Sequence, residues 1–196
     1  MKLLVISDTH GKIDKAIEIY KTRKDVDLIL HLGDLSSDAK KIESQLGVSV
    51  LSVKGNMDGC YSREGYQILE TSFGNIFIAH GHMENVKQSP HNLIYKAESL
   101  GCKAAFYGHT HVPVFEQLGG IYLLNPGSLT LPLGGRKGSY ALVNVTEDKL
   151  KASIVYLTPK VTVVLEPSQE PEPTSSQKSI VEAGTLRDML NNSDRF

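Results

Sequence analysis

The chain has 196 residues and a mass of 21.5 kDa, slightly more than one domain of ordinary size. Hydrophobic residues make up 40% of it and charged residues 22%, and 21 Lys and Arg stand against 22 Asp and Glu. This is the composition of a globular protein, so it excludes a disordered or fibrous chain. The charge balance gives no signal for nucleic acid or a membrane surface, and no apolar run approaches the about 20 residues of a membrane-spanning helix.

Cysteine usage and the N-terminal residues both bear on location. The two cysteines, Cys60 and Cys102, form no CxxC pair, so neither a disulfide framework nor a thiolate zinc site is expected. The apolar run over 3–6 ends at Ser7 and is too short for a secretion signal. We therefore expect a reduced, cytoplasmic protein, and a homo-oligomer is compatible with the sequence.

Short apolar runs alternate with amphipathic stretches through the first half of the chain. The pattern predicts strands and helices in alternation over 3–6, 13–20, 28–30, 39–46 and 48–53. This β-α-β-α-β order implies a largely parallel, buried sheet. Two more strands are predicted over 75–79 and 104–107. Between them, a helix is predicted to begin after Ser89, with Pro90 at its first position, and to end before Gly101.

The rhythm changes after residue 111. Strands separated only by turn residues are predicted over 112–118, 121–124, 139–145 and 151–157. Because no helices fit between these strands, we expect them to form an antiparallel second sheet that packs on the first.

The composition changes again near the C-terminal end of the sequence. Residues 161–178 contain the stretch EPSQEPEPTSSQ, which cannot bury enough apolar surface to offset the entropy of ordering it. We therefore predict a domain over 1–160, a linker over 161–178 and a short tail over 179–196. Ser179 and Thr185 each begin a capping-box pattern, so the tail is either a frayed segment or a short docking helix, and the frayed segment is the simpler interpretation.

Residues that can bind metals follow five of the predicted strands. In chain order they are Asp8 with His10, then Asp34, Asn56, His80, and His109 with His111. Because the carboxyl ends of parallel strands share one edge of a sheet, we expect these side chains to converge. A mixed nitrogen and oxygen set without thiolate suits Mn²⁺, Fe, Zn²⁺, Co²⁺ or Ni²⁺ better than Ca²⁺ or Mg²⁺. Seven ligands are too many for one tetrahedral ion but fit two ions bridged by a carboxylate.

The same residues stand in motifs that resemble a known family. The motifs are Asp8-Thr-His10, Gly33-Asp34, Gly55-Asn56, His80-Gly-His82 and Gly108-His-Thr-His111. Their order and spacing over 1–157 resemble the calcineurin-like metallophosphoesterase superfamily. The short length, the Gly-Asn-Met-Asp form of the third motif and the run Asn125-Pro-Gly-Ser128 are similar to the small phosphodiesterases related to Vps29.

The resemblance implies both a fold and a metal centre. The fold is α/β, a four-layer αββα sandwich in which two mixed sheets pack face to face with helices outside. One divalent ion would be held by Asp8, His10, Asp34 and His111, and the second by Asp34, Asn56, His80 and His109. Asp34 would therefore bridge two transition-metal ions, for which manganese is the first choice.

The reaction implied by the resemblance is hydrolysis of a small phosphodiester by a hydroxide that bridges the two ions. Many family members carry a histidine directly after the motif asparagine, where it helps the leaving oxygen depart. Here that position is Met57, which cannot transfer a proton. The nearest substitute in sequence is His82, and Asp58 is a candidate for orienting a ligand histidine. The predicted catalytic set is Asp34, Asn56, His82 and His109.

Two other functions stay open at this point. One is a Vps29-like interaction scaffold with little catalysis, which is disfavoured because the ligand His10 is present. The other is a phosphomonoesterase, which is disfavoured by the short chain and by Met57.

Three further features have simple structural interpretations. His31 stands inside the strand pattern from Leu28 to Leu32, where a hydrogen-bonded core or interface role is expected. His91 stands in the first turn of a helix, where it is expected to be solvated. The run from Asn125 to Ser128 either forms only a tight turn or also contacts phosphate through backbone amides and Ser128.

Overall fold

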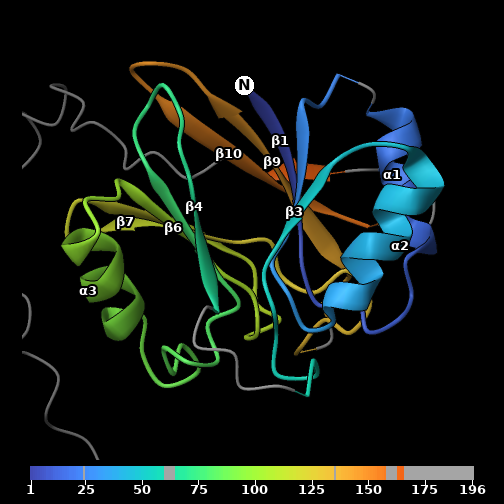
Figure 1. The fold of residues 1–196 in the computed structure, drawn as a ribbon, viewed down its shortest axis with the longest axis horizontal. Coiled ribbons are helices and arrows are strands. Elements are labelled where there is room, and N and C mark those ends of the chain that lie inside the picture. Colours follow the sequence, from blue (N-terminus) through green and yellow to red (C-terminus); the bar gives the residue numbers. More distant parts are fainter. Residues whose placement is uncertain (24, 60–64, 135, 158–162, 166–196) are drawn as a thin grey trace, which may run out of the picture.

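The computed structural model describes residues 1–23, 25–59, 65–134, 136–157 and 163–165. In this part of the chain two β-sheets pack face to face, and helices lie on their outer faces (Figure 1). One apolar core fills the space between the sheets, and each outer face has a further core under its helices. The expected four-layer αββα sandwich is confirmed.

The first sheet has six strands in the order β11-β10-β9-β1-β2-β3. They are β1 Lys2–Ile6, β2 Leu28–His31, β3 Val50–Ser52, β9 Ser139–Val145, β10 Leu150–Tyr156 and β11 Val163–Leu165. Strands β1, β2 and β3 run parallel, whereas β9 pairs antiparallel with β1 and continues into β10 and β11. Strand β1 is almost wholly buried because it lies in the middle of the sheet with side chains packed on both faces, which explains its continuous apolar run.

The second sheet has five strands in the order β4-β5-β6-β8-β7. They are β4 Tyr66–Leu69, β5 Ile76–Ala79, β6 Ala104–Phe106, β7 Val114–Leu118 and β8 Ile121–Asn125. Strands β5, β6 and β8 run parallel, and β4 and β7 pair antiparallel at the two edges. The sheet therefore has a parallel centre, like the β1 to β3 region of its partner.

Three described helices cover the outer faces. They are α1 Asp14–Thr22 and α2 Ser36–Leu46 on the first sheet, and α3 His91–Ser99 on the second. Each helix buries one apolar stripe, such as Ala16 and Ile17 in α1, or Leu93 and Ala97 in α3. Helix α2 is followed by Gly47, whose φ of 66° is the left-handed conformation that commonly closes a helix.

The helix predicted between Ser89 and Gly101 is confirmed. The helix begins at His91, so Pro90 directly precedes it instead of being its first residue, and the Ser89 hydroxyl accepts a hydrogen bond from the backbone N–H of His91 at 3.2 Å. After the helix, the N–H of Gly101 donates to the carbonyl of Glu98 at 2.9 Å. The side chain of His91 is exposed, as expected for a solvated residue.

The division of strands between the sheets differs from the expected one. We expected all strands after residue 111 to form an antiparallel second sheet, and this is wrong because β9 and β10 extend the first sheet. The predicted elements also omit β4, which is a half-exposed edge strand with no clear alternation. In both cases the strand partner is determined by contacts that are distant in sequence, and a short local pattern does not encode them.

Strand β11 lies inside the range expected as a linker, 161–178. Its residue Val163 stands opposite Tyr156 of β10, so the first sheet continues beyond residue 160. The rest of that linker and the tail over 179–196 lie outside the described residues.

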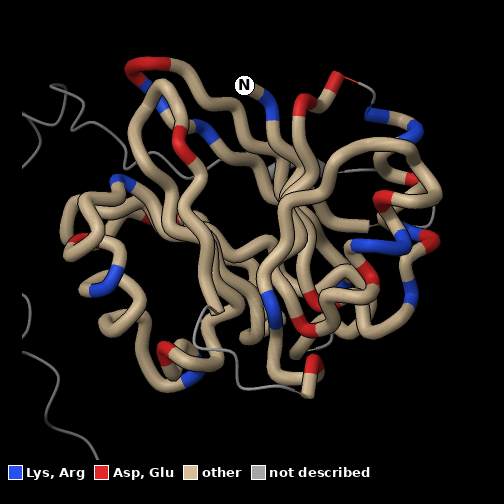
Figure 2. The backbone as a smooth tube through the Cα atoms, in the orientation of Figure 1, with Lys and Arg blue, Asp and Glu red and all other residues tan. Residues whose placement is uncertain are grey.

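Charged residues of both signs are interspersed along the described backbone (Figure 2), in keeping with the overall balance of 21 basic and 22 acidic side chains. Among the helices that the structure describes, none combines the length and the apolar character required to cross a lipid bilayer.

Candidate metal centre

The seven predicted metal ligands follow strands of both sheets. Asp8 and His10 follow β1, Asp34 follows β2, Asn56 follows β3, His80 follows β5, and His109 and His111 follow β6. The loops after these strands lie at the lower side of the molecule in Figure 1. The expectation of one shared edge of a single parallel sheet is therefore wrong, because the meeting point is the rim between two sheets whose parallel strands end on the same side.

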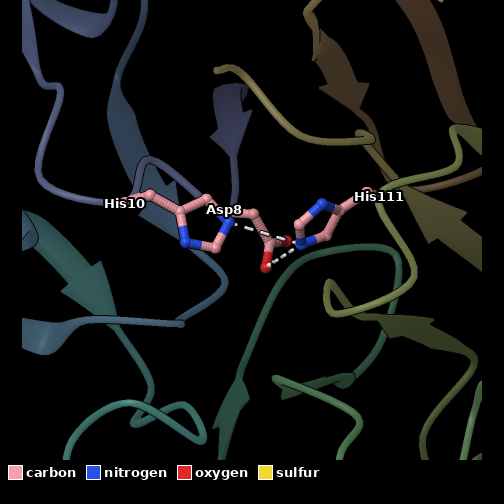
Figure 3. A group of neighbouring side chains, drawn as sticks. All are labelled: Asp8, His10 and His111. Atoms are coloured by element: carbon pink, nitrogen blue, oxygen red, sulfur yellow. Dashed lines mark hydrogen bonds and ion pairs between the residues drawn. The ribbon is translucent and has the colours of Figure 1, made fainter. Parts of the chain in front are cut away.

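One group of three ligands surrounds the carboxylate of Asp8. The Nε2 atom of His111 lies 3.2 Å from Asp8 Oδ1, and the Nε2 atoms of His10 and His111 are 3.4 Å apart. Figure 3 shows the two imidazole rings on either side of the Asp8 carboxylate. One donor atom from each residue lies within 4.8 Å of the other two, a spacing at which three ligands can share one ion.

A second group of three ligands is fully buried and shares Asp8 with the first. Donor atoms of Asp8, Asp34 and His80 also lie within 4.8 Å of one another. The two groups are joined by a contact of 2.7 Å between His10 Nδ1 and Asp34 Oδ2. Both carboxylates therefore lie at the junction of the two groups.

Asn56 and His109 extend the second group. The amide oxygen of Asn56 lies 2.9 Å from His80 Nε2, and the rings of His80 and His109 have centroids 5.0 Å apart. Asn56 is exposed and His109 is half-buried, so this end of the cluster faces solvent. All seven predicted ligands are thus brought into one cluster.

The orientation of two histidines leaves Nε2 free to bind a metal. The Nδ1 atom of His80 lies 2.7 Å from the carbonyl oxygen of Leu32, and the Nδ1 atom of His111 lies 2.7 Å from that of Leu131. Since a carbonyl only accepts, each Nδ1 must carry the proton and donate it, which assigns the lone pair of the neutral ring to Nε2. Metal-binding histidines are commonly oriented by such a bond.

With this tautomer, the contact between His80 and Asn56 joins two acceptors. The Nε2 lone pair of His80 faces the Asn56 amide oxygen at 2.9 Å, and no proton lies between them. Two ligands at right angles on one ion, each about 2.1 Å from it, lie about 3 Å apart. The spacing is therefore compatible with two ligands of one cation.

Two buried carboxylate oxygens support the same conclusion. Asp8 Oδ1 and Asp34 Oδ2 find no hydrogen-bond partner among the described residues, although imidazole nitrogens lie 3.2 and 2.7 Å away. These close contacts lack the direction of a hydrogen bond. A buried carboxylate oxygen left in this state is costly, and a divalent cation would satisfy it. The residues present therefore fit a metal centre.

The protonation states of His80, His109 and Asp8 also favour metal binding, whereas burial raises the pKa of Asp34 and the neighbouring Asp8 carboxylate raises that of His111. Burial lowers the pKa of His80, and it lowers the pKa of His109 to about 4, so both rings are neutral near pH 7. Burial by itself would raise the pKa of Asp8, but the neighbouring imidazoles of His111 and His80 and the hydrogen bond from the Ser7 hydroxyl outweigh it, so the pKa of Asp8 lies below its ordinary value. Neutral imidazole and ionised carboxylate are the forms that bind metals.

The backbone at these ligands is strained. Among the described residues, six positions other than glycine have positive φ, and five of them are predicted ligands: Asp8, His10, Asp34, His109 and His111, with φ between 46° and 85°. Side chains rarely adopt this conformation, and such residues cluster at functional sites. This concentration of strain is independent support for the site, and no sequence pattern indicates it.

Close backbone approach explains two of the motif glycines. A Cβ atom on Gly55 would lie 2.1 Å from the backbone nitrogen of Asp34, and one on Gly108 would lie 2.1 Å from the hydroxyl oxygen of Ser7. Only glycine therefore allows the loops after β3 and β6 to reach the ligands that follow β2 and β1.

The two residues proposed to compensate for Met57 have different surroundings. The ring of His82 lies beside the cluster, with its centroid 5.4 Å from that of His80, and its buried Nδ1 atom finds no hydrogen-bond partner in the described part of the chain. Asp58 instead accepts hydrogen bonds from the backbone N–H groups of Gly55 and Ser36, both at 2.8 Å. The expectation that Asp58 orients a ligand histidine is wrong, because its oxygens join the loop after β3 to the start of α2.

Ser128 supports the first ligand rather than facing solvent. Its hydroxyl is buried and donates to the carbonyl oxygen of Asp8 at 2.8 Å, so the interpretation of Ser128 as a phosphate contact is not supported. Thr130 adds a hydrogen bond to the carbonyl of Thr9 at 3.0 Å. Sequence reasoning missed Thr130, because these partners lie more than a hundred residues away along the chain.

The chain is similar to known phosphoesterases. Residues 1–148 match the model of the calcineurin-like phosphoesterase superfamily domain. The probable metallophosphoesterase YsnB of Bacillus subtilis (strain 168) is 34% identical over 149 residues, which cover 76% of this chain and 86% of that protein. The phosphodiesterase YfcE of Escherichia coli (strain K12) is 28% identical over 169 residues, which cover 74% of this chain and 88% of that protein.

The fold also resembles that of Vps29 from Chaetomium thermophilum, with a TM-score of 0.71 over 85% of this chain and 97% of that one. The identity is only 20%, so this likeness shows the fold alone. The matched range 1–148 contains all the ligands of the cluster. The chain therefore belongs to the calcineurin-like phosphoesterase superfamily.

Proposed function

We propose that this protein is a metal-dependent phosphodiesterase with a dinuclear centre. The observation that carries the proposal is the pair of buried, unpartnered carboxylate oxygens on Asp8 and Asp34, each facing imidazole nitrogens of the same cluster. Family membership and the likeness to phosphodiesterase YfcE support the reaction class.

The ligands divide naturally between two ions. Asp8, His10 and His111 would hold the first, and Asn56, His80 and His109 would hold the second, with Asp34 as the bridge. The contact of Asp34 with His10, and its place in the group with Asp8 and His80, support this bridging role. A mixed nitrogen and oxygen set favours Mn²⁺, with Ni²⁺, Zn²⁺, Fe or Co²⁺ as alternatives.

When bound, the two ions would supply a water of lowered pKa as nucleophile and would neutralise charge on the phosphate. The protein's own groups keep the donor atoms in place. Asp8 and Asp34 supply the negative charge that balances the cations, and neutral His80 and His109 supply lone pairs. Asn56 is the most exposed of the proposed ligands, whereas His10, His109 and His111 are each half-buried.

His82 is the proposed proton donor to the leaving oxygen. Its ring is half-buried beside His80 and His109, at centroid distances of 5.4 and 6.1 Å, so it lies next to the ligands without being one of them. Met57, which stands where many relatives carry a histidine, is 59% exposed and has no proton to give. We propose small phosphodiesters with good leaving groups as substrates, and a cytoplasmic setting.

The test uses chelator-treated full-length protein. Addition of Mn²⁺ or Ni²⁺ is expected to restore hydrolysis of bis(p-nitrophenyl) phosphate, with slower hydrolysis of p-nitrophenyl phosphate. Faster hydrolysis of the monoester would identify a phosphomonoesterase. A folded protein that binds metal but hydrolyses neither compound would contradict the enzymatic proposal and favour a scaffold role.

A further inference from the structure

Three polar side chains outside the metal ligands form a network in the interior. Thr9, His31 and Asp38 are each fully buried and come from the loop after β1, from β2 and from the first turn of α2. The hydroxyl of Thr9 donates to Asp38 Oδ2 at 2.7 Å and lies 3.0 Å from His31 Nε2. The core role expected for His31 is confirmed, and the network gives it a specific partner.

The direction of each hydrogen bond in this network follows from its donors. The backbone N–H of Gly33 donates to His31 Nδ1 at 3.3 Å, so the single proton of the neutral ring must be on Nε2. Nε2 therefore donates a hydrogen bond to the Thr9 hydroxyl oxygen, and the Thr9 hydroxyl donates one to the Asp38 carboxylate. The hydrogen bonds therefore all run in one direction, from His31 through Thr9 to Asp38. The middle position requires a group that both accepts and donates a hydrogen bond, as a hydroxyl does.

The network ends directly beside three proposed ligands. Thr9 stands between Asp8 and His10, whose φ values are 52° and 46°. The Asp38 oxygen that binds Thr9 also accepts the N–H of Gly11 at 2.7 Å, so one carboxylate holds this loop at two points. At the other end, Gly33 immediately precedes Asp34, whose φ is 85°.

A purely structural explanation is less adequate. Asp38 keeps its second oxygen, Oδ1, buried without a hydrogen-bond partner in the described residues, with only Lys41 at 3.6 Å. A buried carboxylate that is only partly satisfied costs stability relative to an apolar residue. The burial of Asp38 is explained if its carboxylate holds the loop after β1 in a strained conformation that this loop would not keep without it.

We propose that Thr9, His31 and Asp38 are positioning residues that hold Asp8, His10 and Asp34 in the metal-binding conformation before any ion arrives. The inference rests on the proposed function, because it requires these ligands to bind metal. It goes beyond that function by assigning the preorganisation of three ligands to one buried chain of hydrogen bonds.

The test is a metal titration of chelator-treated, full-length Thr9→Val, in which the hydroxyl is lost with little change of shape. Co²⁺ is followed by its visible absorption and Mn²⁺ by calorimetry. Affinity is expected to fall about 10–100-fold, as when a partner of a metal ligand is removed. Thr9→Ser, which keeps the hydroxyl, is expected to restore the affinity and the Co²⁺ spectrum.

Two control variants separate positioning from general loss of stability. Thr22→Val makes the same chemical change at the end of α1, where the hydroxyl donates only to the carbonyl of Ile19. Val143→Ala creates a cavity in the core between the sheets. Both are expected to bind Co²⁺ like the wild type. The proposal is overturned if Thr9→Val binds as tightly as the wild type, if Thr9→Ser gives no rescue, or if Val143→Ala weakens binding equally.

A second measurement needs no variant. In metal-free wild-type protein the N–H groups of Gly11 and Gly33 are expected to exchange slowly with solvent, because their partners Asp38 and His31 are already in place. Rapid exchange of both would overturn the proposal even if Thr9→Val fails to fold. A wild type that binds no Co²⁺ would instead contradict the metal centre, so the two failures are distinguishable.

Discussion

At the residue scale, two features mark the site: the backbone conformation of the proposed ligands and the missing hydrogen bonds of their carboxylates. Five proposed ligands have left-handed backbone, and a buried carboxylate oxygen of each of the ligands Asp8 and Asp34 lacks a hydrogen bond in the described structure. Both features cost stability, and a cation would offset the second. These residues are therefore expected to matter more for function than for folding.

Replacement of Asp34 tests this view. Asp34→Asn removes the charge of the proposed bridge without changing its size, so metal-dependent hydrolysis of bis(p-nitrophenyl) phosphate is expected to fall at least about 100-fold. The melting temperature of the metal-free protein is expected to change little, because burial already raises the pKa of Asp34 and opposes its charged form. His91→Ala, at an exposed histidine outside the cluster, is the control and should keep full activity.

The missing proton donor at position 57 leads to a second expectation. Rates with the wild type should fall as the pKa of the leaving alcohol rises, because His82 is the one proposed proton donor to the leaving oxygen and Met57 gives no proton. Met57→His is expected to flatten this dependence and to accelerate substrates with poor leaving groups most. A series of aryl phosphodiesters provides the measurement, and equal slopes for both proteins would count against this role of position 57.

Burial of His31 predicts how stability depends on pH. Burial lowers the pKa of His31 to about 4 from an ordinary 6.5, so between these values the unfolded chain binds more protons than the folded one. The contribution of neutral, buried His31 to the free energy of unfolding is therefore fully present above about pH 6.5. It is lost as the pH falls toward 4, and the total loss from this residue is about 3 kcal/mol. Denaturant unfolding of metal-free protein at pH 7 and pH 5 measures the loss.

Two variants assign that loss to His31. His31→Gln cannot take up the proton, so its free energy of unfolding should change less between pH 7 and pH 5 than that of the wild type. His91→Gln, at an exposed position, should keep the dependence of the wild type. The assignment to His31 is wrong if His31→Gln and the wild type lose stability equally.

At the element scale, much of the fold and of the site was accessible to sequence reasoning. The buried runs of β1, β5 and β6 are continuous and apolar, and β2 is apolar up to its last residue, His31. Each run is followed by a polar motif, so both the strand and its ligand could be predicted. Strands β9 and β10 were also recognisable, but their place in the first sheet was not, because β1 and β9 lie over a hundred residues apart.

The parts of the site that could not be predicted depend on long-range contacts. The positive φ of Asp8 and the hydroxyls of Ser128 and Thr130 that hold its loop follow from tertiary packing. A motif such as Asp8-Thr-His10 indicates the ligands but not the role of the threonine between them, because the partners of Thr9 lie on β2 and α2.

The close approach of the loops after β2 and β3 at Gly55 leads to a prediction for a glycine variant. In Gly55→Ala the added Cβ would meet the backbone of Asp34, so the loop after β3 must move away from the loop after β2. Stability is expected to fall by about 1–3 kcal/mol, and the affinity for metal should fall with it. Gly65→Ala is the control, since its Cβ would meet only Met83 at an ordinary 3.7 Å. Similar behaviour of the two variants would contradict the proposed close approach.

At the scale of the whole molecule, the metal centre joins the two halves of the sandwich. Its ligands come from β1 to β3 of the first sheet and from β5 and β6 of the second, so a bound ion would cross-link the sheets at their common rim. Metal is therefore expected to stabilise the fold as well as to serve the reaction, since a ligand that binds only the folded state raises its stability.

The C-terminal residues after Leu165 are expected to be dispensable for folding and for hydrolysis. The described core, both sheets and every proposed ligand lie within residues 1–165. A chain that ends after Leu165 is expected to fold and to keep metal-dependent hydrolysis within about 2-fold of the full-length protein. Melting curves and turnover of the two proteins provide the comparison, and a large loss of either would show that residues 166–196 contribute to the domain.

The central claim is that two ions share one cluster of ligands at the rim between the sheets. Anomalous diffraction at the manganese absorption edge, from crystals grown with Mn²⁺, tests it most directly. We predict two anomalous peaks about 3.5–4 Å apart, with Asp34 between them, Asp8, His10 and His111 around one, and Asn56, His80 and His109 around the other. A single peak, or ligand side chains that point away from the ions, would contradict the account.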